Sequence, residues 1–223
     1  MVLAYCILDS EKLTTTPAAG VRGAAIETFS CDGLKCVISN HASLGQVSHQ
    51  DALAFHQVIE NIFKQVALVP FRFPTLLNSG TELEEHLKAH ATQYKEDLQR
   101  FKHLVQMELH IAEKKTEPAT GTSSSGTGYL QARSQRAQVI ASVAEAARQA
   151  LVGLVEDWRE MAPLSASNPS LRCYALVARS GVLPFREKLL SRSLPASITM
   201  AISGPWPATA FMSSAVADPA ARP

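Results

Sequence analysis

The chain lacks the features that mark export, membrane insertion or nucleic-acid binding. Its 223 residues carry 21 basic and 20 acidic side chains and a net charge of +1, so they offer no charged surface that would attract phosphate backbones or anionic lipids. No apolar run approaches the roughly 18 residues that cross a bilayer, and no basic segment precedes the apolar residues 2–8 as in a signal peptide. The sequence therefore predicts a cytoplasmic protein that neither spans a membrane nor binds nucleic acid.

Sequence motifs for catalysis are also missing. The chain has no G-x-S-x-G elbow, no P-loop and no G-x-G-x-x-G fingerprint. Its cysteines have no C-x-x-C spacing, and in a reducing cytosol they are expected to be small buried hydrophobic side chains: Cys6, Cys31, Cys36 and Cys173. We therefore expect no enzyme activity, no cofactor and no small-molecule substrate, although a catalytic triad can also assemble from distant residues.

One pair of histidines has the spacing of metal ligands. His86 and His90 lie four residues apart, with Glu82 one turn earlier, so three potential ligands share one face of a predicted helix. Zinc hydrolase motifs of this type place a glutamate directly after the first histidine, and Leu87 occupies that position here. We interpret both histidines as solvated helix side chains and expect no bound metal.

The first 100 residues have the pattern of an α+β domain. Strands are predicted over residues 2–8, 24–29 and 34–39, and a turn at Cys31-Asp32-Gly33 joins the last two. A helix is predicted over about 49–64, because Ser48 and Asp51 form an N-cap pattern before residues with helical apolar spacing. A second helix is predicted to begin at a capping box formed by Thr81 and Glu84.

The second half begins with a strand and a loop. Residues 105–111 alternate between apolar and polar, which is typical of a half-buried strand with Gln106, Glu108 and His110 on its polar face. Residues 116–128 have the composition of a flexible loop. Residues 133–161 carry apolar side chains three or four apart, and this spacing predicts a long amphipathic helix.

The remaining elements complete a recognisable order. An apolar run at 173–177, a helix at 183–190 and an alternating strand at 198–202 follow the long helix. If residues 162–167 form a short edge strand, the order is β-α-β-β-α-β, the ferredoxin-like motif. The predicted organisation is then an N-terminal α+β domain over 1–100, a ferredoxin-like domain over 101–203 and a tail over 204–223.

Four short segments and one acidic residue carry a family resemblance. Residues 204–211 read Gly-Pro-Trp-Pro-Ala-Thr-Ala-Phe and resemble the pattern G-P-[WL]-P-P-Y-x-F after a terminal strand. Residues 69–75 resemble L-P-x-R-F-G-T, residues 128–133 resemble G-x-x-Y-L-x-x-R, and residues 174–179 resemble A-x-L-V-x-R. In their order along the chain, the four segments resemble motifs of the GvpL/GvpF family of gas vesicle proteins. This family typically has a glutamate at the position of Glu108.

The resemblance implies a two-domain α+β protein whose ferredoxin-like second domain has a helical extension and whose C-terminal tail packs between the domains. It also implies an accessory or minor structural protein of gas vesicle assembly, located at the gas vesicle, with the shell protein and other accessory gas vesicle proteins as partners. The positions that it marks as structural or interaction residues are Pro70, Arg72, Phe73, Thr75, Glu108, Tyr129, Leu130, Arg133, Arg179, Gly204, Pro205, Trp206, Pro207 and Phe211.

The chain departs from the family pattern at three positions. Pro74 replaces a glycine, and Ala208 with Thr209 replaces a Pro-Tyr pair. A proline fixes φ and donates no amide hydrogen, so a contact made through that glycine's backbone would be altered.

The aromatic residues of the terminal segment have two interpretations. Its prolines favour an extended backbone that presents Trp206 and Phe211. We favour structural docking, in which both rings are buried and anchor the tail. The alternative is an exposed aromatic that binds a partner.

Three functions therefore remain to be compared. The leading hypothesis is the gas vesicle assembly protein, which predicts a small, very hydrophobic shell protein encoded beside this chain. A ferredoxin-like regulatory or ligand-binding module would be stabilised against heat by its ligand. An unrecognised hydrolase would turn over a substrate.

Overall fold

The computed structural model describes residues 1–9, 13, 15–114, 126–161 and 170–212, and for residues 126–133 it describes the backbone alone. This part of the chain is a mixed α/β protein with four α-helices and two β-sheets. The chain divides into two compact units. Unit 1 comprises Met1–Leu104 and the residues from Trp206 onward, and unit 2 comprises Val105–Pro205.

Unit 1 contains a sheet with the strand order β2-β3-β1-β4, in which β5 also pairs with β1. Its strands are β1 (Val2–Asp9), β2 (Ile26–Cys31), β3 (Leu34–Asn40), β4 (Leu68–Pro70) and β5 (Leu76–Leu77). The predicted turn between β2 and β3 is confirmed. Asp32 and Gly33 form a two-residue connection with φ of 50° and 77°, the left-handed values that a tight hairpin requires.

Strand β1 is covered on both faces, which explains its unbroken apolar sequence. Every residue from Val2 to Leu8 is buried. On one face, Ala4 and Ile7 join the core that helix α2 (Gly80–Arg100) covers. On the other face, the Tyr5 ring stacks at 4.9 Å on Phe55 of helix α1 (His49–Phe63). A register shift between Ala4 and Cys6 lets residues of different parity reach the same core.

The N-termini of the two helices show one confirmed and one wrong prediction. At α1 the capping box is complete, because the Asp51 amide donates to Ser48 Oγ at 3.1 Å and the Ser48 amide donates to Asp51 Oδ2 at 2.9 Å. The box predicted at Thr81 and Glu84 is wrong. Helix α2 begins two residues earlier, where the extended Ser79 caps it by accepting a hydrogen bond from the Glu82 amide.

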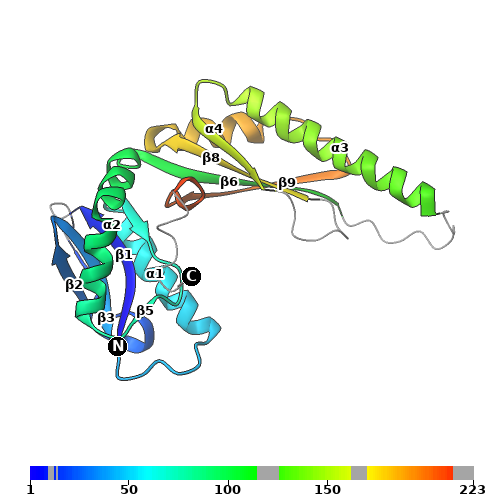
Figure 1. Cartoon of the computed structure of the whole chain (residues 1–223). Coiled ribbons are helices and arrows are strands. Elements are labelled where there is room, and N and C mark those ends of the chain that lie inside the picture. The colour runs from blue at the N-terminus through cyan, green and yellow to red at the C-terminus, as the bar shows by residue number, and fades with distance from the viewer. Residues whose placement is uncertain (10–12, 14, 115–125, 162–169, 213–223) are drawn as a thin grey trace. The chain divides into compact units, whose positions relative to one another are not determined.

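Unit 2 follows the order β6-α3-β7-β8-α4-β9. Its sheet has the strand order β7-β8-β6-β9. Helices α3 and α4 cover one face of this sheet, where their apolar side chains form a common core with the strands (Figure 1). The bounds of these elements are β6 (Leu104–Glu113), α3 (Gly126–Ala150), β7 (Val155–Met161), β8 (Ser170–Ala178), α4 (Val182–Leu190) and β9 (Ile198–Trp206).

The long helix predicted over 133–161 is wrong in its second half. Helix α3 ends at Ala150, and the chain turns at Gly153, whose φ of 82° is a left-handed value. Residues 155–161 form β7, which pairs antiparallel with β8. Leu154 and Trp158 still pack against the core. Apolar side chains at helical spacing can therefore reach the core from a turn and a strand as well as from a helix.

Other boundaries in the second half also differ from the expectation. The predicted edge strand over 162–167 lies outside the described residues, and β7 is the strand beside β8. Most of the loop predicted over 116–128 lies outside them too, and its last three residues belong to α3. No helix in the described ranges has both the length and the apolar character of a membrane span.

Candidate functional site

The segment after β4 is fastened to the neighbouring strand by backbone hydrogen bonds. The Phe71 amide donates to the Tyr5 carbonyl at 2.9 Å, and the Ala4 amide donates to the Thr75 carbonyl at 3.1 Å. The Thr75 hydroxyl donates to the Arg72 carbonyl at 2.6 Å, which closes the turn between them. Thr75 is buried and the Arg72 side chain is exposed. These predicted site residues therefore hold the turn in place.

Aromatic contacts fix the same turn to α1. The Phe73 ring lies 5.1 Å from the Phe55 ring, which is the ring that stacks on Tyr5. Pro70 is half-buried at the end of β4, and Pro74 is exposed at the turn. The turn thus contributes one side of a buried aromatic cluster, and the proline that departs from the family pattern lies on its outer side.

A buried polar chain lies beside this cluster. The Tyr5 hydroxyl shares a hydrogen bond of 2.9 Å with Ser39 Oγ, which shares another of 2.8 Å with His41 Nε2. The Val21 amide donates to the Tyr5 hydroxyl at 3.0 Å. A Cβ at Gly20 would lie 2.3 Å from that hydroxyl, so only glycine fits there. Ser39 is fully buried, and a serine–histidine pair that no substrate can reach is structural.

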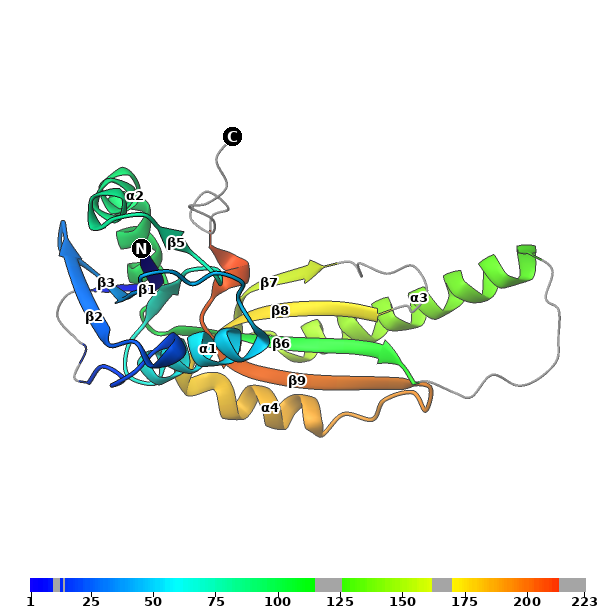
Figure 2. The same cartoon turned by 90° about the horizontal axis from the view of Figure 1, so that it is seen from below.

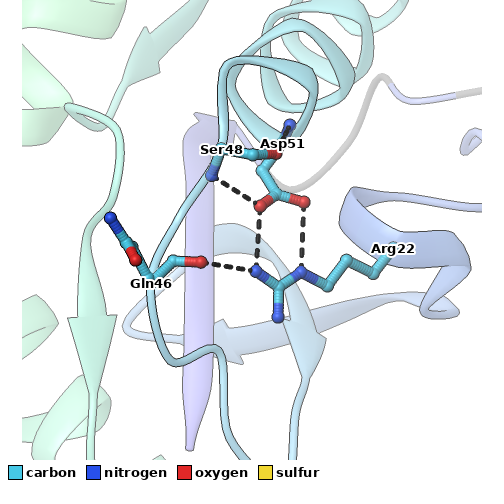
Figure 3. Close-up of polar contacts among 4 residues, drawn as sticks. All are labelled: Arg22, Gln46, Ser48 and Asp51. Atoms are coloured by element: carbon cyan, nitrogen blue, oxygen red, sulfur yellow. Dashed lines mark hydrogen bonds and ion pairs between the residues drawn. The ribbon is translucent and has the colours of Figure 1, made fainter.

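An ion pair joins the short helix η1 (Val21–Gly23) to the N-terminus of α1 (Figure 3). Arg22 donates from Nε and Nη2 to the two oxygens of Asp51, at 3.1 and 2.9 Å, and from Nη2 to the Gln46 carbonyl at 3.0 Å. Hydrogen bonds from Arg22 and then from the Ser48 amide hold the Asp51 pKa well below its usual range. Sequence reasoning missed Arg22, because no local pattern links residues so far apart.

The histidines of α2 are half-buried, so their interpretation as solvated side chains is wrong. His86 Nε2 shares a hydrogen bond of 2.7 Å with the Tyr94 hydroxyl, and the His86 ring lies 4.6 Å from the His90 ring. Burial and then His90 lower the His86 pKa to about 4. Among the described residues, no three histidine, cysteine or acidic side chains are grouped so that they could hold a metal ion.

Glu108 lies on the face of the unit 2 sheet opposite α3 and α4. Figure 2, which is seen from below, shows this face in front of α3, and we call it the outer face. Glu108 Oε1 lies 3.3 Å from Nη1 of Arg172 on β8, whose side chain is 58% exposed. His110 is half-buried, as expected for a polar face, whereas Gln106, predicted on the same face, is buried. The outer face therefore presents a partly exposed charge pair.

Arg179 and Gly204 occupy tighter positions in unit 2. Arg179 is half-buried just after β8, and burial lowers its pKa. Gly204 has φ of 109°, and a Cβ there would lie 2.8 Å from the Gln106 carbonyl oxygen. The Gly204 carbonyl accepts a hydrogen bond from Arg186 Nη2. Strand β9 continues to Trp206, so the first three residues of the predicted tail, 204–206, belong to the strand.

The two tail aromatics differ in burial. Phe211 is 1% exposed, and its carbonyl accepts a hydrogen bond of 3.3 Å from Arg100 Nη1 at the end of α2. The next residue, Met212, packs against the core under α2. Trp206 is 43% exposed, so it is not the buried anchor that the sequence analysis expected. Phe211 alone fits that description, within the short helix η3 (Thr209–Phe211).

Comparison with known proteins decides the family. Residues 1–213 match the family model described as gas vesicle synthesis protein GvpL/GvpF. This chain belongs to the GvpL/GvpF family. No curated protein sequence matches it.

Two solved structures of gas vesicle protein GvpF have a similar fold. The GvpF of Anabaena sp. PCC7120 has a TM-score of 0.75 at 14% identity, covering 94% of each chain. The GvpF of Microcystis aeruginosa has a TM-score of 0.73 at 13% identity, covering 94% of this chain and 98% of that one. The GvpL/GvpF fold is thus present with little sequence identity.

The remaining GvpL/GvpF motif residues lie in α3 and around Trp206. Helix α3 contains Tyr129, Leu130 and Arg133, and the structure describes only the backbone of these three residues. Pro205 is exposed and Pro207 is half-buried on either side of Trp206. The motif residues whose contacts are described mostly hold turns and strand ends, and they do not converge on one cleft.

Proposed function

We propose that this chain is an accessory or minor structural protein required for gas vesicle assembly. It acts by contacts with the shell protein and with other gas vesicle proteins, without a catalytic step. The observation that carries this proposal is the match of residues 1–213 to a family described as gas vesicle synthesis proteins. The fold shared with two GvpF structures, over 94% of this chain, supports it.

The chemistry of the described residues favours contacts over catalysis. The one serine–histidine pair that we describe has hydrogen-bond geometry but no access for a substrate. The buried cysteines include Cys6 and Cys173, and burial raises the pKa of both thiols, which disfavours the nucleophilic thiolate. These groups support a role in packing.

We further propose that unit 2 has a ferredoxin-like fold. Its element order is β-α-β-β-α-β, and its sheet places the first and third strands of that order, β6 and β8, next to each other in the middle. Both helices cover one face of the sheet. This arrangement leaves the outer face for a partner.

The outer face is our candidate contact surface for the shell protein. Arg172 is paired with Glu108, yet more than half of its side chain is exposed, so a partner could contact it without burying an unpaired charge. A charged group at an interface fixes the register of the partner, and truncating it can weaken the complex. The pair is therefore suited to setting the orientation of a shell subunit.

The segment from Gly204 to Phe211 is proposed to couple the two units. Gly204 packs closely against β6 of unit 2, and Phe211 is bonded to Arg100 of unit 1. Because only six residues lie between these positions, ordering one end restricts the other.

A pull-down with the full-length chain and the shell protein tests these proposals. Wild type should retain the shell protein, Arg172→Ala should lose most of it, and the control Arg192→Ala, an exposed arginine away from the outer face, should retain it. Failure of wild type to bind any gas vesicle protein would contradict the proposed function. Equal binding by Arg172→Ala would contradict only the contact surface.

A further inference from the structure

The loop around η1 in unit 1 has a backbone conformation that needs support. Arg22 has φ of 54° and Gly23 has φ of 74°, so both lie in the left-handed region. A residue with a side chain adopts this region only when the surrounding structure holds it there. An isolated bridge between Ala19 and Ala25 closes the loop, which we define as residues 19–25. The contacts of this loop must therefore hold Arg22 in its strained form.

Two sets of contacts hold the loop. The fully buried Val21 donates its amide hydrogen to the Tyr5 hydroxyl at 3.0 Å, which fastens the loop to β1. Arg22 donates to Asp51 and to the Gln46 carbonyl, which fastens the loop to the N-terminus of α1 (Figure 3). The loop thus depends on one buried hydrogen bond and one ion pair.

The hydrogen-bond chain behind Val21 is satisfied in one direction only. An amide can only donate, so the Tyr5 oxygen accepts from Val21, and the hydrogen of the buried Tyr5 hydroxyl points to Ser39 Oγ, 2.9 Å away. Ser39 is also fully buried, so its hydroxyl hydrogen needs an acceptor, and His41 Nε2 lies 2.8 Å from it. His41 Nε2 therefore accepts, which means that the ring is neutral and carries its hydrogen on Nδ1.

A proton on His41 reverses the last bond of this chain. With hydrogens on both ring nitrogens, Nε2 donates to Ser39 Oγ, and the Ser39 hydroxyl can then only turn toward Tyr5. The Tyr5 and Ser39 hydroxyls share one remaining contact, so one of their two hydrogens has no acceptor. An unpaired polar group is costly in a protein interior. The chain that ends on Val21 is therefore complete only while His41 is neutral.

The charges around His41 act in the same direction. The charged groups that face it are Arg22 of η1, the Met1 amino group at the start of β1 and Asp51 at the start of α1. Burial is the largest cause of the lowered His41 pKa, followed by Arg22 and the amino group, and Asp51 opposes them. A positive His41 would repel Arg22 and attract the Asp51 carboxylate. It would therefore also weaken the ion pair that fastens the loop to α1.

We propose that protonation of His41 opens the loop of residues 19–25. Neutral His41 keeps the chain to Val21 complete, and protonated His41 releases the loop together with Arg22. The open form binds the proton more readily than the closed form does, so closing becomes less favourable as pH falls below 6.5. This inference concerns unit 1 alone and does not depend on the role in gas vesicle assembly.

Hydrogen exchange of the full-length protein, measured by mass spectrometry on peptides that contain residues 19–25, tests the proposal. The intrinsic pH dependence of exchange is first subtracted. Protection of the loop in wild type should then fall roughly five- to tenfold between about pH 7.5 and about pH 5.5, because the open form gains a proton over this range. Protection of β6 in unit 2 is the internal reference and should not follow this change.

Two histidine variants distinguish opening of the loop from unfolding of unit 1. His41→Gln cannot gain a charge, so protection of residues 19–25 should no longer depend on pH, whatever its level. His86→Gln removes a different titrating histidine and should keep the wild-type response of the loop. Protection that does not change with pH in wild type, or a His41→Gln variant with the wild-type response, would overturn the proposal. Loss of the response in His86→Gln would overturn it too, because the effect would then belong to α2.

Discussion

The sheet of unit 1 has a helix against each face of β1, whereas the sheet of unit 2 has both helices on one face. The central strand of each sheet shows the difference in its sequence. Every residue of β1 from Val2 to Leu8 is apolar and buried, but β6 alternates and places Glu108 on the outer face. The number of covered faces therefore determines whether the sequence of the strand is apolar throughout or keeps a polar face.

The comparison also explains where the polar groups lie. Inside unit 1, Tyr5 and Ser39 are fully buried and hydrogen-bonded, because an unpaired polar group there would be costly. On the outer face of unit 2, Arg172 keeps most of its hydration while paired. Unit 1 should thus be sensitive to packing changes, and the outer face of unit 2 should be tolerant of them.

The largest effect is expected at the end of the chain that packs in unit 1. Phe211→Ala removes a ring that is 1% exposed and should lower the free energy of unfolding by about 3–5 kcal/mol. Trp206→Ala is the matched comparison, and because 43% of Trp206 is exposed it should cost less, about 1–2 kcal/mol. Urea titration measures both. If both variants lowered the free energy of unfolding by the same amount, the burial of the two rings would not explain their contributions to stability.

Within unit 2, a glycine that contacts another strand can be compared with one that does not. Gly204→Ala should cost about 1–3 kcal/mol from its positive φ, and more because the new Cβ would lie 2.8 Å from the Gln106 oxygen. Gly153→Ala has a similar φ penalty of about 1–2 kcal/mol but no neighbour within 4 Å. Urea midpoints should therefore rank Gly204→Ala as the more damaging change, and the reverse order would contradict the close packing of β9 on β6.

A smaller, pH-dependent effect is expected in unit 1. The His86 pKa of about 4 lies below its usual 6.5, so between these values the unfolded chain binds a proton at His86 that the folded chain does not. The free energy of unfolding should therefore fall as pH decreases from 6.5 to 4. His86→Gln, which cannot titrate, should flatten the dependence of the urea midpoint on pH over this range. An unchanged slope would count against the burial of His86.

The smallest change in stability is expected on the outer face. Arg172→Ala breaks a pair in which the arginine is 58% exposed, so it should lower the free energy of unfolding by no more than about 1 kcal/mol. The same variant should lose binding to the shell protein. A large loss of stability would show that Arg172 supports the sheet, and would remove the distinction between the two units.

Local chemistry made a good part of the fold predictable. The Ser48–Asp51 cap, the Asp32-Gly33 turn and the strand at β6 depend on residues close in sequence, and the structure has all three. The alternation of β6 holds from Met107 to Ile111, whereas Gln106 is buried. The end of α3 was not predictable in this way. Apolar spacing continues past Ala150 into β7, so the helical pattern persists although the chain has turned at Gly153.

The features of the candidate site that could not be predicted depend on contacts between residues far apart in the sequence. Nothing near Arg22 indicates that it pairs with Asp51, and nothing near Tyr5 indicates its bond to Ser39. Trp206 and Phe211 look alike in sequence, yet only Phe211 is buried. Which aromatic is buried depends on the surface against which the chain end packs, and that surface forms only in the folded unit.

Deletion of the gene, followed by electron microscopy of the cells, tests the central claim most directly. If the chain is required for gas vesicle assembly, the deleted strain should lack normal gas vesicles, and the wild-type gene should restore them. Normal vesicles in the deleted strain, equal in number and shape to those of the parent, would contradict the account.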